Sequence, residues 1–178
     1  MTRTNARPTD ADLLAARAEI FGSIFVVVQH LTRRADAELD EMDLTTRQWL
    51  LLAVLTKWFP GRDASLTEAA ERYGSSRQNV KQIALGLEAR GFLQLVPDPA
   101  DGRATRLRLT HKVRIFDRPE AVARQAAMLA DVTAGLTVEE TLVLRDLVVR
   151  WLTGVSTPGG TVAGTGGAGA STAEGVAQ

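Results

Sequence analysis

Residues 65–91 read SLTEAAERYGSSRQNVKQIALGLEARG. Apolar residues recur with helical spacing on both sides of Tyr73-Gly74-Ser75, so we predict helices over 66–73 and 76–90 joined by a tight turn. The pairs Ser65/Glu68 and Ser75/Gln78 have the spacing of an N-terminal capping box, in which a hydroxyl and a Glu or Gln side chain satisfy the first free amides of a helix. This stretch therefore predicts a helix-turn-helix.

The second of these helices has two distinct faces. Its apolar positions follow the i, i+3, i+4, i+7 pattern of a buried stripe and are Val80, Ile83, Ala84 and Leu87. The opposite face carries Gln78, Lys81, Gln82 and Ala89, with Arg77 and Asn79 on the flanks of the first turn. Leu85 also faces outward, and it is either a contact for a thymine methyl group or simply an exposed leucine.

A β-hairpin is predicted directly after the helix-turn-helix. The segments 93–96 and 105–109 read as strands, and the joining residues 97–104, PDPADGRA, are typical of a turn. Arg106 and Arg108 alternate with apolar residues in the second strand, so we expect a basic outer face. Two helices followed by such a hairpin predict a winged helix-turn-helix.

The outward residue types suit the major groove of DNA. Gln and Asn side chains bind adenine, Arg binds guanine, and Lys neutralises phosphate, while a helix N-terminus offers free amides to a phosphate. A solvated polar face is the alternative, and we favour DNA binding because helix, turn and hairpin coincide. The candidate DNA-binding residues of this helix are Ser75, Ser76, Arg77, Gln78, Asn79, Lys81 and Gln82.

The charge distribution also favours DNA binding. The 178 residues include 21 basic and 21 acidic residues, so the formal net charge is zero. Residues 75–114 nevertheless contain eight Lys and Arg residues against three Asp and Glu residues. A basic block within an otherwise acidic chain indicates a surface that meets a polyanion.

Further helices are predicted over 10–34, 46–59 and 138–152, and capping-box patterns at Thr45/Gln48 and Thr137/Glu140 mark the starts of the last two. Another helix should follow Thr110, break near Phe116 because Pro119 cannot sit deep inside a helix, and resume to about residue 134. The first and last helices are apolar around most of their circumference, which favours a helical homodimer over a thick monomer core.

Several functional classes are excluded or disfavoured. The chain has no cysteine, its two histidines are far apart, and its longest apolar run is too short to span a bilayer, so we expect no metal, no cofactor and no membrane partner. No signal-peptide core follows the first residues, which predicts a cytoplasmic protein. No catalytic motif is present, so an enzyme is not expected. A winged-helix module that binds protein instead of DNA remains the alternative.

The chain also resembles the multiple-antibiotic-resistance regulator (MarR) family of bacterial transcription factors. The resemblance rests on SLTEAA at 65–70, GSSRQ at 74–78, LEARGFL at 87–93, DPADGR at 98–103 and LT at 109–110. It implies a homodimer formed by the terminal helices, a major-groove helix at 76–90, and a minor-groove contact by Arg103, oriented by Asp101. It also implies a small aromatic ligand, whose pocket walls could include Phe21, Phe25, Trp49 or Trp58, although core packing is the favoured interpretation for each of these side chains. Val113, where the family has glycine, and Pro119 depart from the family pattern.

The expected fold is thus mainly α-helical with a small β-hairpin wing. A flexible arm at 1–9 precedes a helical dimerisation region at 10–44 and 110–153, which flanks a winged helix-turn-helix DNA-binding domain at 45–109. The Gly-, Ala- and Thr-rich residues 154–178 are expected to be a disordered tail, because they carry too little apolar surface to fold. The predicted function is a ligand-responsive repressor that binds a roughly palindromic operator.

Overall fold

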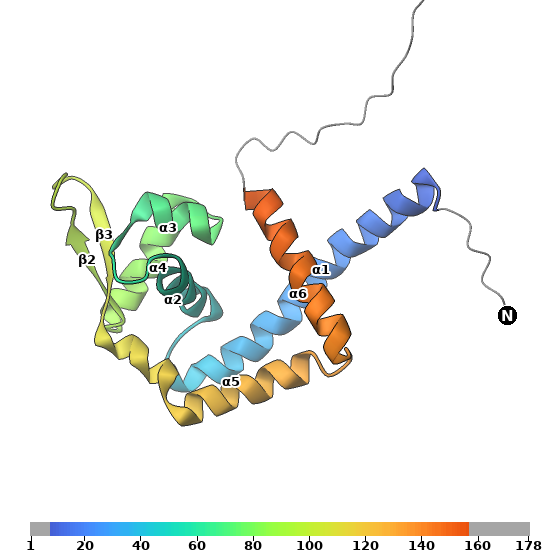
Figure 1. Ribbon diagram of the computed structural model, residues 1–178. Coiled ribbons are helices and arrows are strands. Elements are labelled where there is room, and N and C mark those ends of the chain that lie inside the picture. The colour runs from blue at the N-terminus through green and yellow to red at the C-terminus, as the bar shows by residue number, and fades with distance from the viewer. Residues whose placement is uncertain (1–7, 157–178) are drawn as a thin grey trace, which may run out of the picture.

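The computed structural model describes residues 8–156, so residues 1–7 of the expected arm and 157–178 of the expected tail lie outside it. In chain order the elements are α1 (Asp10–Leu39), η1 (Asp40–Met42), α2 (Thr46–Trp58), β1 (Ala64–Ser65), α3 (Leu66–Tyr73), α4 (Arg77–Ala89), β2 (Leu93–Pro97), β3 (Thr105–Leu109), η2 (His111–Asp117), α5 (Pro119–Val132) and α6 (Val138–Ser156), where η denotes a 3₁₀ helix. Figure 1 shows α2, α3, α4 and the strands β2 and β3 gathered in one group. The helices α1 and α5 lead away from this group, and α6 crosses α1 in this view. The predicted fold class, a mainly helical winged helix-turn-helix, is confirmed.

The sheet has three antiparallel strands in the order β1-β3-β2. Leu107 in the central strand lies opposite Ala64 of β1 on one side and Leu95 of β2 on the other. The predicted hairpin is confirmed, whereas β1 was not predicted. Two residues are too few to show the alternation of polar and apolar side chains that identifies a strand.

Within residues 8–156, one hydrophobic core lies between α2, α3, α4 and the sheet. Its largest fully buried side chains are Phe92, Leu51, Leu55, Leu87, Leu93, Leu107 and Val80. The stripe predicted for α4 supplies Val80 and Leu87 to this set, and Ile83 and Ala84 are buried beside them. The buried stripe fixes which face of α4 points away from the protein.

Helix starts follow the capping patterns with one exception. Capping boxes are present at Thr45/Gln48, Ser65/Glu68 and Thr137/Glu140. The box predicted at Ser75/Gln78 is wrong, because Ser76 is the N-cap of α4 and its hydroxyl accepts a hydrogen bond from the backbone N–H of Asn79. A further box, Thr9/Asp12, opens α1.

Two helices are longer than predicted. The first was expected to end at Arg34, but α1 continues to Leu39, since Ala35 and Leu39 are four residues apart and pack against the core. The last was expected to end at Leu152, but α6 continues to Ser156, where Val155 extends its apolar side. Residues 154–156 of the expected tail are therefore helical.

The connection to α5 breaks where the proline predicts. Thr110 caps η2, a 3₁₀ helix rather than an α-helix, by accepting from the backbone N–H of Lys112. Arg118 is extended, with φ −67° and ψ 140°, and Pro119 occupies the first turn of α5. Proline is tolerated there because the first amides of a helix have no intrahelical acceptor.

Candidate DNA interface and the adjoining cavity

The turn between α3 and α4 is closed by backbone geometry. Gly74 has φ 73°, a left-handed conformation that costs other residues energy, and its N–H donates to the carbonyl of Ala70. The N–H of Ser75 donates to the same carbonyl at 3.0 Å. These bonds end α3 and turn the chain directly into α4.

The outer face of α4 is free of the core. The side chains of Arg77, Gln78, Lys81, Gln82, Leu85 and Ala89 are exposed. Because the opposite stripe is buried, these residues lie on the side that the protein presents outward. The first turns of this face carry the amide and cationic groups, and the later turns carry Leu85 and Ala89.

The tip of the wing is ordered by its own side chains. The carboxylate of Asp101 accepts from the backbone N–H of Arg103 at 3.0 Å, and the side chain of Arg103 is exposed. Asp98 is buried, and its carboxylate accepts from the N–H of Ala100 and from Arg106 Nε at 2.7 Å. The hydrogen bond from Ala100, followed by Arg106, holds the pKa of Asp98 below its ordinary value.

Both arginines of the predicted basic outer face of the hairpin form ion pairs with carboxylates. Arg106 pairs with Asp98, and its Nη1 also donates to the backbone carbonyl of Asp63. Arg108 binds the carboxylate of Asp63 through two nitrogens at 2.9 and 3.0 Å. The two arginines therefore fasten the wing to the loop before β1. Arg108 stays exposed although it is paired, and Arg103 at the tip is exposed away from both ion pairs. Asp63 lies outside the hairpin, so its proximity to the two arginines depends on the β1–β3 pairing.

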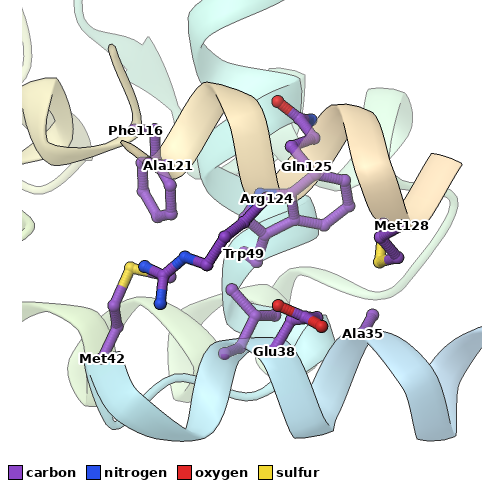
Figure 2. Close-up of a pocket in the computed structure, with 10 residues that line it drawn as sticks. Ala35, Glu38, Met42, Trp49, Phe116, Ala121, Arg124, Gln125 and Met128 are labelled. Atoms are coloured by element: carbon purple, nitrogen blue, oxygen red, sulfur yellow. The ribbon is translucent and has the colours of Figure 1, made fainter. Parts of the chain in front are cut away.

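A cavity of about 130 Å³ lies beside the winged helix (Figure 2). It is bounded by α1 and η1 on one side, by η2 and α5 on the other, and by Trp49 of α2. The wall is mostly apolar, and Glu38, Arg124 and Gln125 supply its polar groups. Arg124 forms an ion pair with Glu41 of η1, so η1 and α5 are joined next to the cavity.

Only one of the four aromatic residues expected near a ligand lines this cavity. Trp49 does, whereas Phe21 and Phe25 are exposed on α1 and pack edge-to-face with each other at 5.0 Å. Trp58 lies near the surface beside Lys57. Phe21 and Phe25 lie near the middle of α1, and the cavity forms at the C-terminal end of that helix.

Residues 42–104, from the end of η1 to the wing tip, match the sequence profile of the MarR family. These residues form a MarR-family domain. No curated protein sequence matches the chain.

Solved structures share the fold beyond the MarR-family domain. BpsR from Bordetella bronchiseptica, whose DNA binding is regulated by 6-hydroxynicotinic acid, is 21% identical and aligns over 75% of this chain and 98% of its own, with a TM-score of 0.64. The PcaV transcriptional regulator from Streptomyces coelicolor, solved with its natural ligand, is 26% identical over 87% of this chain and 99% of its own, with a TM-score of 0.55. The organohalide-sensing regulator RdhR, solved in a 2,4-dichlorophenol-bound form, is 18% identical and aligns over 88% of this chain and 90% of its own, with a TM-score of 0.67.

Within the MarR-family domain, two of the candidate residues bind each other. The side-chain amide of Asn79 donates to Ser75 Oγ at 2.8 Å, and both residues are half-buried. Ser76 is engaged as the N-cap of α4. Gln78, Lys81 and Gln82 lie together on the exposed face, and Arg103 lies apart from them at the wing tip. Asp101 supports the backbone of Arg103 rather than its guanidinium group.

The structure adds residues that sequence reasoning missed. Asp98 could have been found from the hairpin register, which pairs Pro97 with Thr105 and so brings Asp98 near Arg106. The cavity residues Glu38, Met42 and Arg124 carry no local signal in the sequence, because they meet only after α1 and α5 pack.

Among residues 8–156, no cluster of three or more His, Asp or Glu side chains is placed to bind a metal, and no helix is long and apolar enough to cross a membrane.

The carboxylate of Glu68 should make the stability of the MarR-family domain depend on pH. Its carboxylate accepts from Arg62 and from the backbone N–H of Ser65, and these bonds lower its pKa from 4.5 to about 2. A depressed pKa stabilises the folded state above the unfolded pKa, and this stability is lost as pH falls toward 2. The difference in unfolding free energy between wild type and Glu68→Gln should therefore shrink from pH 6 to pH 2.5, as measured by urea denaturation.

Arg62→Gln provides the matched variant, because Arg62 makes the largest contribution to the pKa shift of Glu68. Its unfolding free energy should depend less steeply on acid pH than that of the wild type. If the unfolding free energies of wild type and Glu68→Gln changed in parallel with pH, the Glu68 carboxylate would have no role in the pH dependence of stability.

Proposed function

We propose that the protein is a sequence-specific double-stranded DNA-binding transcriptional regulator, a cytoplasmic ligand-responsive repressor that acts as a homodimer on a roughly palindromic operator. The main support for the proposal is the exposed face of α4, which presents Gln78, Lys81 and Gln82 together. The apolar stripe on the opposite face of this helix is buried in the core. Such a face, on the second helix of a helix-turn-helix, fits the major groove. The exposed arginine at the wing tip suits an adjacent minor groove.

A homodimer is supported by the apolar surface of the long helices. On α1, Phe21 and Phe25 are 62% and 60% exposed, and on α6 Leu147 and Trp151 are 47% and 43% exposed. Contiguous apolar surface of this kind marks an interaction site. A second copy of the chain would cover α1 and α6 and place two copies of α4 on half-sites about 10 bp apart from centre to centre.

A small ligand is supported by the cavity beside the MarR-family domain. Trp49 and Phe116 provide apolar walls, and Arg124 and Glu38 provide the few polar groups that orient a bound molecule. The relatives BpsR and RdhR respond to or bind small aromatic molecules. We infer a small aromatic effector that binds between α1 and α5.

The function can be tested by selecting DNA with the purified protein. Genomic fragments bound by the protein are recovered and sequenced, and the enriched site is measured by fluorescence anisotropy over a range of salt concentrations. A regulator should enrich a two-fold symmetric site and show a linear fall of log affinity with log salt. Absence of any enriched site, together with salt-independent binding, would favour a winged-helix protein-interaction module.

Gln78 and Gln82 should read bases, and Lys81 should contact phosphate. Gln78→Ala or Gln82→Ala is expected to cost about 1–3 kcal/mol on the enriched site and to relax the preference at particular base pairs. Lys81→Ala should weaken binding to all sequences similarly and reduce the salt slope by about one unit. Anisotropy on the enriched site and on single-base variants measures both effects.

Arg72→Ala is a suitable control, because it removes an exposed positive charge from α3 rather than from α4. It should leave the base preference unchanged. Uniform losses for the Gln78 and Gln82 variants across all sites would show that these side chains do not read bases.

Arg103 should act through the minor groove. A·T-rich tracts narrow this groove and deepen its negative potential, which attracts an inserted guanidinium group. Arg103→Ala is therefore expected to lose more affinity on operators with A·T-rich flanks than on operators with G·C-rich flanks. Equal losses would indicate a phosphate contact only, and no loss would remove the wing tip from the DNA interface.

A further inference from the structure

The C-terminal end of α4 is held by several hydrogen bonds and an ion pair at Arg90. Arg90 is the C-cap of α4, and its guanidinium group reaches the loop between η1 and α2. There Nε donates to the backbone carbonyl of Asp43, and the guanidinium forms an ion pair with the Asp43 carboxylate at 3.0 Å. Nη1 also donates to Gly86 within α4, which braces the side chain against its own helix. Arg90 therefore ties α4 to the end of η1.

Asp43 occupies a constrained position for this contact. Its φ is 51°, and among residues 8–156 it is the one non-glycine residue with positive φ. Aspartate tolerates the left-handed conformation better than most residues, but the conformation still costs energy. The backbone carbonyl and the carboxylate of Asp43 both face Arg90 as a result.

The same helix end is also tied to η2. Lys112 Nζ donates to the carbonyl of Arg90 at 2.7 Å and lies 4.5 Å from the centre of the Phe92 ring. The hydroxyl of Thr110 donates to the carbonyl of Gly91 at 2.7 Å. Thr110 and Lys112 thus hold the backbone at the end of α4 independently of the Arg90 side chain.

These two ties lead to opposite walls of the cavity. Met42 lines the cavity and directly precedes Asp43, so the first tie starts at the α1 and η1 wall. Phe116 lines the facing wall and stacks on the buried ring of Phe92 at 6.2 Å, so the second tie starts at the η2 and α5 wall. Figure 2 shows Met42 and Phe116 on these two sides of the cavity.

We propose that Arg90 is a positioning residue that couples the occupancy of this cavity to the placement of the DNA-reading helix α4. When the two walls of the cavity move apart, Asp43 and η2 move apart with them. The end of α4 is bound to both, so it must shift relative to at least one of them. Without the Arg90 side chain, the bonds from Thr110 and Lys112 still join the helix end to the η2 side, but its direct link to Asp43 is lost, and α4 no longer responds to the α1 wall. The proposal rests on the DNA-binding function proposed above.

A cavity-filling substitution tests the coupling without a known effector. Ala121→Phe places a ring in the cavity from α5 and is combined with Arg90→Gln in a double-mutant cycle. We expect Ala121→Phe alone to change the Kd for the enriched DNA site by about fivefold or more, the lower end of allosteric couplings. In the Arg90→Gln background the same substitution should change Kd by less than about twofold.

Arg114→Gln is the charge-matched control, since it removes an exposed arginine from η2, and in its background Ala121→Phe should act as in the wild type. Equal effects of Ala121→Phe with and without Arg90, or no effect in the wild type, would overturn the proposal. If Ala121→Phe does not fold, Ala35→Leu fills the cavity from the facing wall.

Amide hydrogen exchange of α4 provides a readout that does not need DNA. Ala121→Phe should alter the protection of α4 amides in the wild type and leave it unchanged in Arg90→Gln. This pattern in a protein that binds no DNA would refute the proposed function and retain the coupling. Protection that responds identically in both backgrounds would refute the coupling alone.

Discussion

The Phe25→Asp variant is expected to be monomeric and to lose most of its DNA affinity. Phe25 and Phe21 form an exposed aromatic pair on α1, and aromatic side chains are enriched in the cores of protein interfaces. An unpaired carboxylate buried at this point costs several kcal/mol, and the symmetry of a homodimer introduces it twice. A loss of this size corresponds to a reduction in DNA affinity of about 100-fold or more.

Analytical ultracentrifugation measures the first effect, with the wild type expected near twice the chain mass of 19.2 kDa. Ser23→Asp is the matched control, because it adds the same charge two residues away on the polar side of α1. It should remain dimeric. A wild type that sediments as a monomer at micromolar concentration would contradict the dimer, and a dimeric Phe25→Asp would move the interface away from this aromatic pair.

Replacing Phe92 with alanine should destabilise the winged helix by about 3–5 kcal/mol, the cost of removing a large aromatic side chain from a packed core. Phe92 is fully buried, stacks on Phe116, and follows the end of α4 where its backbone N–H donates to the carbonyl of Leu87. Since domains of this size are stable by only about 5–15 kcal/mol, the variant should lose a large fraction of its total stability.

Urea denaturation followed by circular dichroism measures this loss. Leu50→Ala serves as the control, because Leu50 of α2 is 42% exposed and its truncation leaves no buried cavity. Its cost should stay below about 1 kcal/mol. Similar losses for the two variants would mean that Phe92 contributes no more than a surface side chain.

The helix-turn-helix could be predicted because its signals are local. The apolar stripe of α4, the glycine at position 74 and the capping box at Ser65 each act within a few residues, and each has the predicted role. The Ser75/Gln78 box was wrong because two consecutive serines offer two possible N-caps. The structure uses the second of them, Ser76.

Features that depend on distant partners could not be read in this way. The arginines of β3 alternate with apolar residues as a basic surface would, yet Asp63 and Asp98 neutralise them after the sheet forms. The cavity is similar, since α1 and α5, which supply its walls, are far apart in the sequence. Periodicity identifies which face of a helix is apolar, but it does not identify the element that covers this face.

The two-residue strand β1 also affects when the domain can fold. Ala64 pairs with Leu107 across roughly forty residues, whereas α3, α4 and the β2–β3 hairpin form from neighbouring segments. Contacts between distant residues carry a larger loop-closure cost and slow folding. During synthesis, β1 leaves the ribosome well before its partner strand, so Asp63 has no arginine to bind until β3 has followed. The fastening of the wing is therefore among the last steps in the biosynthesis of this domain.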